Sequence, residues 1–380
     1  MSAVYLDHAA TSPIHPKVMQ TMAEVEKQCF GNPSSIHRFG REARQQLELA
    51  RGKIAESIGA KESEIIFTSG GTEADNLAIV GTALRHKEAG RHIVTSSIEH
   101  HAVLHSCKFL ESMGFEISYV PVGENGVIQV DDVKAALRDD TVLVSIMFGN
   151  NEVGTIQPIA EIGALLNDTS ILFHSDAVQA YGMIQMNVQE LGVDLLSTSA
   201  HKINGPKGIG FLYVKEGVQL TPLLYGGKQE QQGRAGTENV AGIVGFQTAV
   251  DMIQQTMETR WDEYVRFRKK MLDLFDEHEI SFRVNGDREN VLPHILNVSF
   301  PNTTAEALLV SLDLAGVAVS SGSACTAGSL EPSHVLGAMY SNKERGKSAI
   351  RFSFGLGTTM EDIEKAAFET IHAVKRITGR

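Results

Sequence analysis

Residues 195–208 read LLSTSAHKINGPKG, and this stretch is the most informative one in the chain. Residues 195–198 have the pattern of a short strand buried inside a sheet. Lys202 follows directly and stands between a histidine and a Gly-Pro turn. A lysine in such a place can lose its hydration, which lowers its pKa and makes it a nucleophile toward carbonyl carbon. A lone lysine would be better read as a surface residue in a turn, and we read Lys207 in that way.

The chain before this stretch alternates between strand-like and helix-like segments. The predicted strands are residues 65–68, 92–96, 117–122, 142–148 and 171–174. The predicted helices are residues 73–85, 101–113, 130–137 and one that Pro158 opens. This alternation predicts a mostly parallel sheet with helices on both faces, which is an α/β fold.

The pattern changes after about residue 256. Short strands are predicted at 282–285, 295–300, 317–320 and 350–354, with helices at 305–314 and at the C-terminal end. Trp261 and the charged run 266–270 suit a long connecting helix. We therefore predict a large domain at residues 15–256, and a smaller α+β domain made of residues 1–14 plus 257–380.

Composition and charge exclude several classes of protein. Apolar residues make up 42% of the 380 residues, and the net charge is −12. This acidic balance argues against direct nucleic-acid binding, which needs a basic surface. The cysteines, Cys29, Cys107 and Cys325, are odd in number and show no CxxC spacing, so we expect neither disulfides nor a metal site. We see no signal peptide and no membrane-spanning apolar run, and we expect a cytoplasmic protein.

Two further segments carry polar groups that suit a phosphorylated, electron-withdrawing cofactor. Asp176, in the run HSDAVQ at 174–179, lies at the carboxyl end of a predicted strand. A carboxylate there can pair with the protonated pyridine nitrogen of pyridoxal 5'-phosphate (PLP); a helix N-cap is the alternative. The run TSGGTE at 68–73, which includes Gly71 and Thr72, leads into a helix whose first N–H groups suit a phosphate. By itself this last signal is weak.

The order of these elements, a phosphate site, then an aspartate, then a lysine, is that of fold-type-I PLP enzymes. More specifically, the chain resembles the cysteine desulfurases of the NifS/IscS class from about residue 5 to residue 375. The motifs that carry the resemblance are DHAAT (7–11), FGNPSS (30–35), TSGGTEADN (68–76), EH (99–100), NNE (150–152), the Asp176 segment, SAHK (199–202) and RAGT (234–237). The resemblance implies a fold-type-I PLP-dependent transferase.

The resemblance also implies roles for single residues. Those expected to bind PLP are Gly71, Thr72, His100, Asn151, Asp176, Gln179, Ser199, His201, Lys202 and Thr237. Lys202 would hold the cofactor covalently, His100 would stack on its ring and act in acid–base steps, and Gln179 would bind the ring hydroxyl. Thr72, Ser199 and His201 would hold the phosphate. Without the resemblance, a capping or core histidine and a turn asparagine would be the better readings of His100 and Asn151.

Thr237 would reach the phosphate of the other subunit's cofactor, so the resemblance implies a homodimer. Arg351 matches the arginine that binds the substrate carboxylate, together with Asn151. A planar guanidinium suits that task, and a solvent-facing strand residue is the alternative.

A serine- and glycine-rich run, SSGSACTAGSLEP at 320–332, separates this family from other PLP enzymes. We expect Cys325, in this run of small residues, to be a mobile nucleophilic thiol; a small buried thiol is the alternative. The resemblance makes it the residue that carries the persulfide, in the group of desulfurases with the longer loop. Cys29 and Cys107 match no family site, and we read both as structural.

The resemblance thus predicts an enzyme with Lys202, His100 and Cys325 as catalytic residues, which converts L-cysteine to L-alanine. Its partner would be a protein sulfur acceptor, either an iron–sulfur scaffold or a tRNA-thiolating enzyme. Since the chain stops at Arg380 without the C-terminal extension of some members, we expect a dedicated acceptor rather than scaffold docking by that route. An aminotransferase would not need Cys325, a selenocysteine-selective lyase stays open, and a non-catalytic adaptor would not need all four of Lys202, Asp176, His100 and Cys325.

Overall fold

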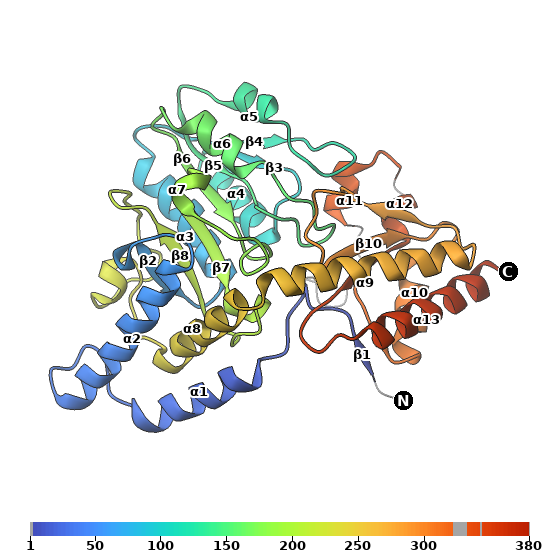
Figure 1. The fold of residues 1–380 in the computed structure, drawn as a ribbon. Coiled ribbons are helices and arrows are strands. Elements are labelled where there is room, and N and C mark those ends of the chain that lie inside the picture. The colour runs from blue at the N-terminus through green and yellow to red at the C-terminus, as the bar shows by residue number, and fades with distance from the viewer. Residues whose placement is uncertain (1–2, 322–332, 343, 380) are drawn as a thin grey trace.

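A seven-stranded sheet forms the centre of the computed structural model, which describes residues 3–321, 333–342 and 344–379 (Figure 1). Its order is β2-β8-β7-β6-β5-β3-β4. The strands are β2 (Ile65–Thr68), β3 (His92–Ser96), β4 (Glu116–Val120), β5 (Thr141–Ser145), β6 (Leu172–Asp176), β7 (Leu195–Ser199) and β8 (Gly210–Val214). β3 to β7 run parallel to one another, whereas β8 runs antiparallel to β7 and β2. The predicted α/β class with a mostly parallel sheet is confirmed.

Helices cover both faces of this sheet because its strand residues point alternately to either side. Leu143, Leu195 and Leu212 pack with α3 (Gly71–His86) and α4 (His101–Ser112) on one face. Val144, Leu196 and other residues of the opposite face join the core that includes α2 (Arg38–Glu56), α6 (Ile159–Leu166) and α8 (Val240–Gln254). Shorter or peripheral elements are α1 (Pro16–Gln28), α5 (Val130–Ala136), α7 (Val188–Leu191) and the 3₁₀ turns Glu62–Glu64, Ala200–Lys202 and Gln229–Gln232.

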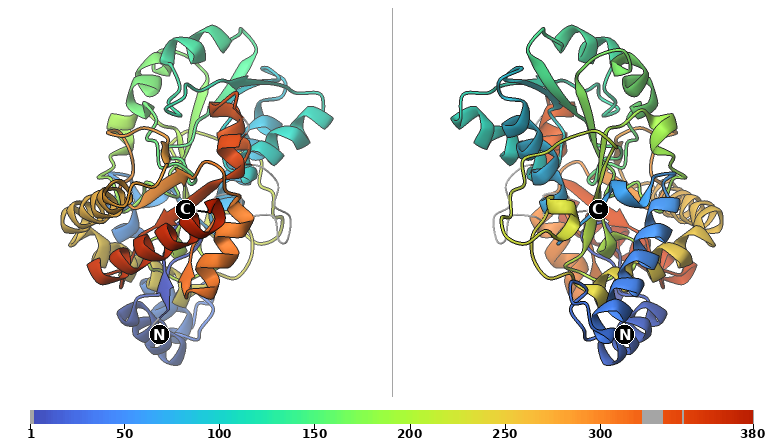
Figure 2. Two further views of the ribbon diagram at one scale, coloured as in Figure 1. Left: turned by 90° about the vertical axis from the view of Figure 1, so that its right-hand side faces the viewer. Right: turned by 90° about the vertical axis from the view of Figure 1, so that its left-hand side faces the viewer.

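The remaining elements build a smaller α+β unit. β9 (Arg283–Asn285), β10 (Ile295–Ser299) and β12 (Ala349–Ser353) form an antiparallel sheet in the order β12-β10-β9. α9 (Met257–Glu277), α10 (Ala305–Leu314) and α13 (Met360–Thr378) pack against it, with α9 and α13 side by side in Figures 1 and 2. α11 (His334–Met339) and α12 (Glu344–Lys347) complete the unit.

The N-terminal strand also belongs to this unit, because β1 (Val4–Tyr5) pairs in parallel with β11 (Val317–Ala318). α8 ends at Gln254 and α9 begins at Met257, on either side of the expected join at residue 256. The long connecting helix is therefore confirmed as α9. The division into residues 15–256 and 1–14 plus 257–380 stays a prediction.

Some predicted boundaries are wrong. β5 ends at Ser145 rather than at Phe148, although the backbone N–H of Phe148 still donates to the carbonyl of Asp176 beyond the ladder. Pro158 is the N-cap of α6 rather than its first residue. β11 ends at Ala318, and Ser320 forms only an isolated bridge with Arg351. Cys107 is buried in α4 and Cys29 half-buried at the end of α1, as expected of structural thiols.

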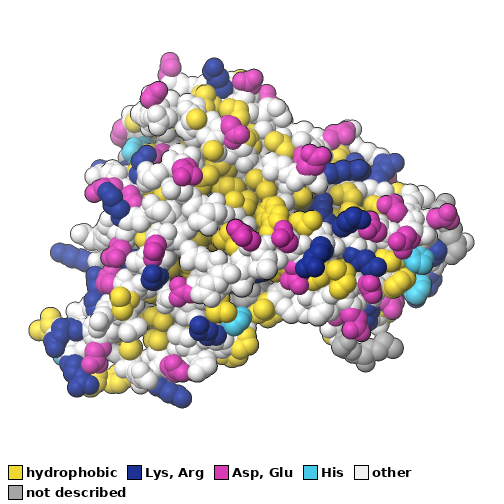
Figure 3. Space-filling view, in the orientation of Figure 1, with side chains coloured by type: hydrophobic (Ala, Val, Ile, Leu, Met, Phe, Trp, Pro, Cys, Tyr) yellow, Lys and Arg dark blue, Asp and Glu magenta, His cyan; other side chains and the backbone are white. Residues whose placement is uncertain are grey.

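Apolar side chains gather above the beginning of α9 on the face shown in Figure 3, where Ile184, Met257 and Trp261 line a groove. Basic and acidic side chains are interspersed on the same face. Over the described residues, no helix is long and apolar enough to cross a membrane.

Candidate active site

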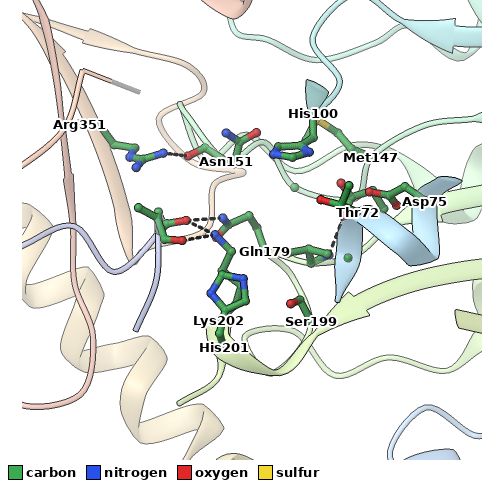
Figure 4. A pocket seen from close by; sticks show the side chains of 16 residues that line it. Thr72, Asp75, His100, Met147, Asn151, Gln179, Ser199, His201, Lys202 and Arg351 are labelled. Carbon is green, nitrogen blue, oxygen red and sulfur yellow. Dashed lines mark hydrogen bonds between the residues drawn. The ribbon is translucent and has the colours of Figure 1, made fainter. Parts of the chain in front are cut away.

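One cavity of about 430 Å³ collects all the predicted site residues except Thr237 and Cys325 (Figure 4). Its walls come from the N-terminal segment, the beginning of α3, the end of β6, the turn after β7, and β12. The predicted residues among those lining it are Gly71, Thr72, His100, Asn151, Asp176, Gln179, Ser199, His201, Lys202 and Arg351. Sequence reasoning missed Ala9, Ala10, Asp75, Met147, Gly149 and Val178, which line it as well.

Lys202 lies in the 3₁₀ turn that directly follows β7, so the buried strand fixes where its side chain begins. Its Nζ donates hydrogen bonds to the carbonyl oxygens of Ala9 (2.5 Å) and Ala10 (2.8 Å). The neighbouring His201 ring lies 3.1 Å from the Thr11 hydroxyl, on the same N-terminal segment. The DHAAT motif thus supplies backbone acceptors that hold the lysine at the cavity wall.

Asp176 ends β6 and points into the cavity from the carboxyl edge of the sheet, where α/β proteins bind their ligands. The backbone N–H of Val178 donates to its Oδ1 at 2.9 Å. Burial raises the pKa of Asp176 to about 6, while this hydrogen bond and the charge of Lys202 act in the opposite direction. The carboxyl is therefore mostly ionised at neutral pH and can face a cation.

The N-terminus of α3 forms the opposite end of the cavity. Gly70 precedes it at φ +150°, a conformation that favours glycine, and no side chain caps the helix there. A Cβ on Gly71 would lie 2.7 Å from Val178, so only glycine fits. The first N–H groups of α3, with the hydroxyls of Thr72 and Ser199 nearby, suit a phosphate.

His100 occupies the N-cap of α4, where its Nδ1 accepts a hydrogen bond from the backbone N–H of Ala102 at 3.1 Å. It is therefore a capping histidine as well as a cavity residue, and the two readings do not exclude each other. Burial and then the charge of Lys202 lower the pKa of His100 to about 4, with smaller contributions from neighbouring histidines. The ring is neutral at physiological pH, and because its Nδ1 accepts the N–H of Ala102, its own proton lies on Nε2.

Arg351 reaches the cavity from the middle of β12, an edge strand of the small sheet. Its Nη1 donates to the backbone carbonyl of Asn151 at 2.8 Å, and its Nη2 pairs with Asp7 at 2.9 Å. The side chain is almost fully buried, so the alternative of a solvent-facing strand residue is wrong. Arg351 and Asn151, which we expected to bind the substrate together, are in direct contact.

Gln179 is held from two sides. Its Nε2 donates to the carbonyl of Ala9 at 2.9 Å, and its Oε1 lies 3.4 Å from the His294 ring. These contacts orient the side-chain amide at the cavity wall.

Two predicted residues lie elsewhere. Thr237 is exposed and does not line the cavity of its own chain. Cys325 lies outside the described residues. The residues on either side of its segment are nevertheless tied to the cavity wall: the backbone N–H of Ser320 donates to the carbonyl of Arg351, and Ser333 donates to Glu152, next to Asn151.

The donor set in the cavity fits PLP. An anion site at the beginning of α3 stands at one end, and a buried carboxylate on Asp176 can face a pyridine nitrogen. A lysine and a neutral histidine lie in the same cavity. These four groups match the phosphate, the ring nitrogen, the aldehyde carbon and the ring face of the cofactor.

Comparison with known proteins gives the family. Residues 4–366 match the class-V aminotransferase family. The chain is 56% identical to the IscS 1 protein of Bacillus subtilis (strain 168) over 100% of both chains. It is 51% identical to cysteine desulfurase IscS of Dictyoglomus turgidum, over 95% of this chain and 91% of that one. A solved NifS-like protein superposes with a TM-score of 0.92 at 36% identity, covering 97% of this chain and 98% of that one. With matches of this extent along the whole chain, the protein belongs to the class-V aminotransferase family and, within it, to the PLP-dependent cysteine desulfurases of the IscS/NifS class.

Proposed function

We propose that the chain converts L-cysteine to L-alanine and takes up the sulfur on Cys325 as a persulfide. The observation that carries this proposal is the single cavity that joins Lys202, Asp176 and Arg351. Ser320 and Ser333, which flank the segment with Cys325, contact the wall of the same cavity. A class-V enzyme that only moved amino groups would have no use for the thiol of that segment.

Different residues of the cavity would bind different parts of the cofactor and of the substrate. Lys202 would hold PLP covalently, Asp176 its pyridine nitrogen, and the N-terminus of α3 its phosphate. Arg351 would bind the substrate carboxylate, because a guanidinium offers several parallel N–H donors to two oxygens. When bound, PLP withdraws electrons from the substrate Cα, which makes the Cα proton acidic and activates the Cβ–S bond.

Lys202 and His100 would then transfer protons, and Cys325 would take up the sulfur. Lys202, once released from the cofactor, is the base for the Cα proton. The Cys325 thiolate attacks the substrate sulfur: an S–S bond forms, and the Cβ–S bond breaks with its electron pair left on the carbon fragment. His100, which lines the same cavity, is the candidate for passing a proton to that fragment, which is released as alanine.

The test is a product assay with purified PLP-loaded protein, L-cysteine and a reductant. We expect equal amounts of sulfide and alanine from the wild type. Cys325→Ala should release neither product while keeping the absorbance of bound PLP, and Cys107→Ala is the control thiol. Sulfide release by Cys325→Ala at the wild-type rate would contradict the role of Cys325. Lys202→Ala should lose both products and the covalently bound cofactor.

The proposal includes a homodimer and a protein sulfur acceptor. Exposed apolar side chains support the dimer, among them Phe30 and Ile36 before α2 and Tyr225 near the RAGT motif. We expect sedimentation equilibrium to give twice the 41.3 kDa mass of one chain. For the acceptor, we propose an iron–sulfur scaffold or a tRNA-thiolating enzyme. Incubation with 35S-labelled cysteine and both kinds of protein should label one of them, and labelling of neither would contradict the proposal.

A further inference from the structure

Asp75 is a buried carboxyl in the cavity to which neither the resemblance nor the proposed mechanism assigns a role. It lies in the second turn of α3, within the TSGGTEADN motif, and its side chain is 1% exposed. Asp75 lines the same cavity as Asp176 and is labelled beside Thr72 in Figure 4. It therefore stands on the wall of the cavity that would hold the cofactor.

The surroundings of Asp75 offer little to stabilise a negative charge. One of its oxygens lies within 4.8 Å of ligand atoms of both Asp176 and His100. Oδ1 has no hydrogen-bond partner among the described residues, and the nearest nitrogen of an ion-pair partner there is His174 Nε2 at 3.6 Å. An ionised Asp75 would thus be a buried, poorly solvated charge beside a second carboxylate.

His174 cannot supply the missing positive charge. It is fully buried on β6, and its ring lies between the hydroxyls of Ser145 (2.8 Å) and Ser197 (2.9 Å). Burial lowers the pKa of His174 to about 3, so the ring is neutral at physiological pH. Both ring nitrogens of His174 thus have hydrogen-bond partners on the neighbouring strands β5 and β7.

The titratable groups around Asp75 raise its proton affinity. Burial, then Asp176, and then Glu99 raise the pKa of Asp75 well above its usual value, and only Ser197 opposes them. Asp176 differs because it accepts a hydrogen bond from Val178 and is attracted by Lys202. When two neighbouring carboxyls hold one proton, it resides on the one with fewer stabilising contacts, which here is Asp75.

We propose that Asp75 is a positioning residue that keeps a proton beside Asp176, so that the pair presents a single negative charge, located on Asp176, to the pyridine nitrogen of PLP. This inference rests on the proposed role of Asp176. A second charge would repel the first and favour protonation of Asp176 itself, which would weaken its pairing with the nitrogen.

The experiment is difference infrared spectroscopy in H2O and D2O near pH 7, which separates protonated carboxyls from carboxylates. We expect a protonated-carboxyl band in the wild type that Asp75→Asn removes. Glu99→Gln is the matched control, because Glu99 is another buried carboxyl with a raised pKa and should contribute a band of its own. A spectrum unchanged in Asp75→Asn would overturn the proposal.

The spectrum of bound PLP gives an independent readout. Asn is as neutral as a protonated Asp, so Asp75→Asn should leave the pH profile of the cofactor absorbance unchanged and its Kd within about threefold. Asp176→Asn should weaken PLP binding more than about tenfold, since it loses a hydrogen bond to a charged group. An Asp75→Asn profile shifted like that of Asp176→Asn would mean that Asp75 is ionised. A wild type that binds no PLP would instead contradict the proposed function, and the infrared band of the protein alone would still test Asp75.

Discussion

At the scale of single residues, the active site depends on buried charges whose partners come from distant parts of the sequence. Arg351 on β12 is paired with Asp7 and bonded to the backbone of Asn151. Lys202 is bonded to the carbonyls of Ala9 and Ala10. Each cationic group is thus oriented before any substrate enters, which reduces the cost of ordering it during the reaction.

Arg351→Lys tests the substrate-binding role. Lysine keeps the positive charge but loses the planar array of donors. We expect kcat/KM for L-cysteine to fall roughly ten- to hundredfold, mainly through a higher KM, which corresponds to one charge-assisted hydrogen bond of about 1.5–3 kcal/mol. PLP binding should not change. Arg283→Lys, at an exposed arginine of the same small sheet, is the control and should behave as wild type. An unchanged KM for Arg351→Lys would contradict the assignment.

Glu99→Gln tests a buried carboxyl next to the site. Burial raises the pKa of Glu99 to about 8, although Ser96 and the N–H of Met147 donate to it. The folded protein therefore keeps a proton on Glu99 that the unfolded chain loses above about pH 4.5. The wild type should lose stability through this group as pH rises from about 5 to about 8, whereas glutamine cannot ionise.

The measurement is urea unfolding of both proteins across that pH range. The stability of Glu99→Gln relative to wild type should increase steadily with pH and level off above about pH 8. Glu88→Gln, at an exposed position of the same large unit, controls for general charge effects. Parallel pH profiles of wild type and Glu99→Gln would show that Glu99 is ionised in the folded protein.

At the scale of elements, one glutamate joins a strained loop, residues 230–232, to α2 and β2. Arg51 on α2 forms two hydrogen bonds with Glu230, at 2.8 and 2.7 Å, and both side chains are buried. Glu230 also accepts from the N–H of Phe67 on β2. Glu230, Gln231 and Gln232 all have positive φ, which costs energy in residues other than glycine. The ion pair offsets this strain and positions the RAGT motif that follows.

Glu230→Ala should destabilise the protein by about 3–5 kcal/mol, because it leaves the Arg51 guanidinium buried without a partner. The double variant Arg51→Leu/Glu230→Leu should recover part of this loss. Urea unfolding at constant pH measures both, and Glu216→Ala, which breaks an exposed pair with Lys61, is the control with an effect below about 1 kcal/mol. Equal stabilities of Glu230→Ala and Glu216→Ala would contradict the fastening role.

Most strands of the large sheet could be predicted from the sequence, but β8 and the buried position of Asp75 could not. Apolar runs located β2, β3 and β7 because these strands are buried on both faces. β8 was not predicted: its direction depends on the tight turn after Lys202, and a strand–helix alternation carries no sign of such a reversal. Asp75 was missed because a charged residue in a helix is usually exposed. Its neighbours Ala74, Leu77 and Ala78, all buried, were the available signal that this side of α3 faces the sheet.

At the scale of the whole molecule, the proposed dimer makes each active site depend on two chains. The exposed position of Thr237, away from its own cavity, agrees with a role at the partner's cofactor. No pattern within one chain predicts such a contact, and only the resemblance to the family suggested it.

Mixed dimers test this arrangement. Thr237→Ala homodimers should bind PLP roughly tenfold more weakly, for the loss of one hydrogen bond to a charged phosphate. In a mixed dimer of one Lys202→Ala subunit and one Thr237→Ala subunit, the second subunit keeps its lysine and receives an intact threonine from the first. That site should bind PLP with wild-type affinity. Weak binding in the mixed dimer would place Thr237 at the cofactor of its own chain.

The pairing of β1 with β11 has a consequence for how the protein is made. Residues 4–10 leave the ribosome long before residues 317–353, yet Val4 pairs with Val317, Asp7 with Arg351, and the N–H of Ala9 with Ser353. The large sheet can fold on the nascent chain, whereas the wall that holds Lys202 closes only after almost all of the chain has been synthesised. Cofactor loading is then a late step in maturation. An affinity tag joined directly before β1 would lie one short strand away from this wall, so a tag placed after α13 should interfere far less with assembly of the site.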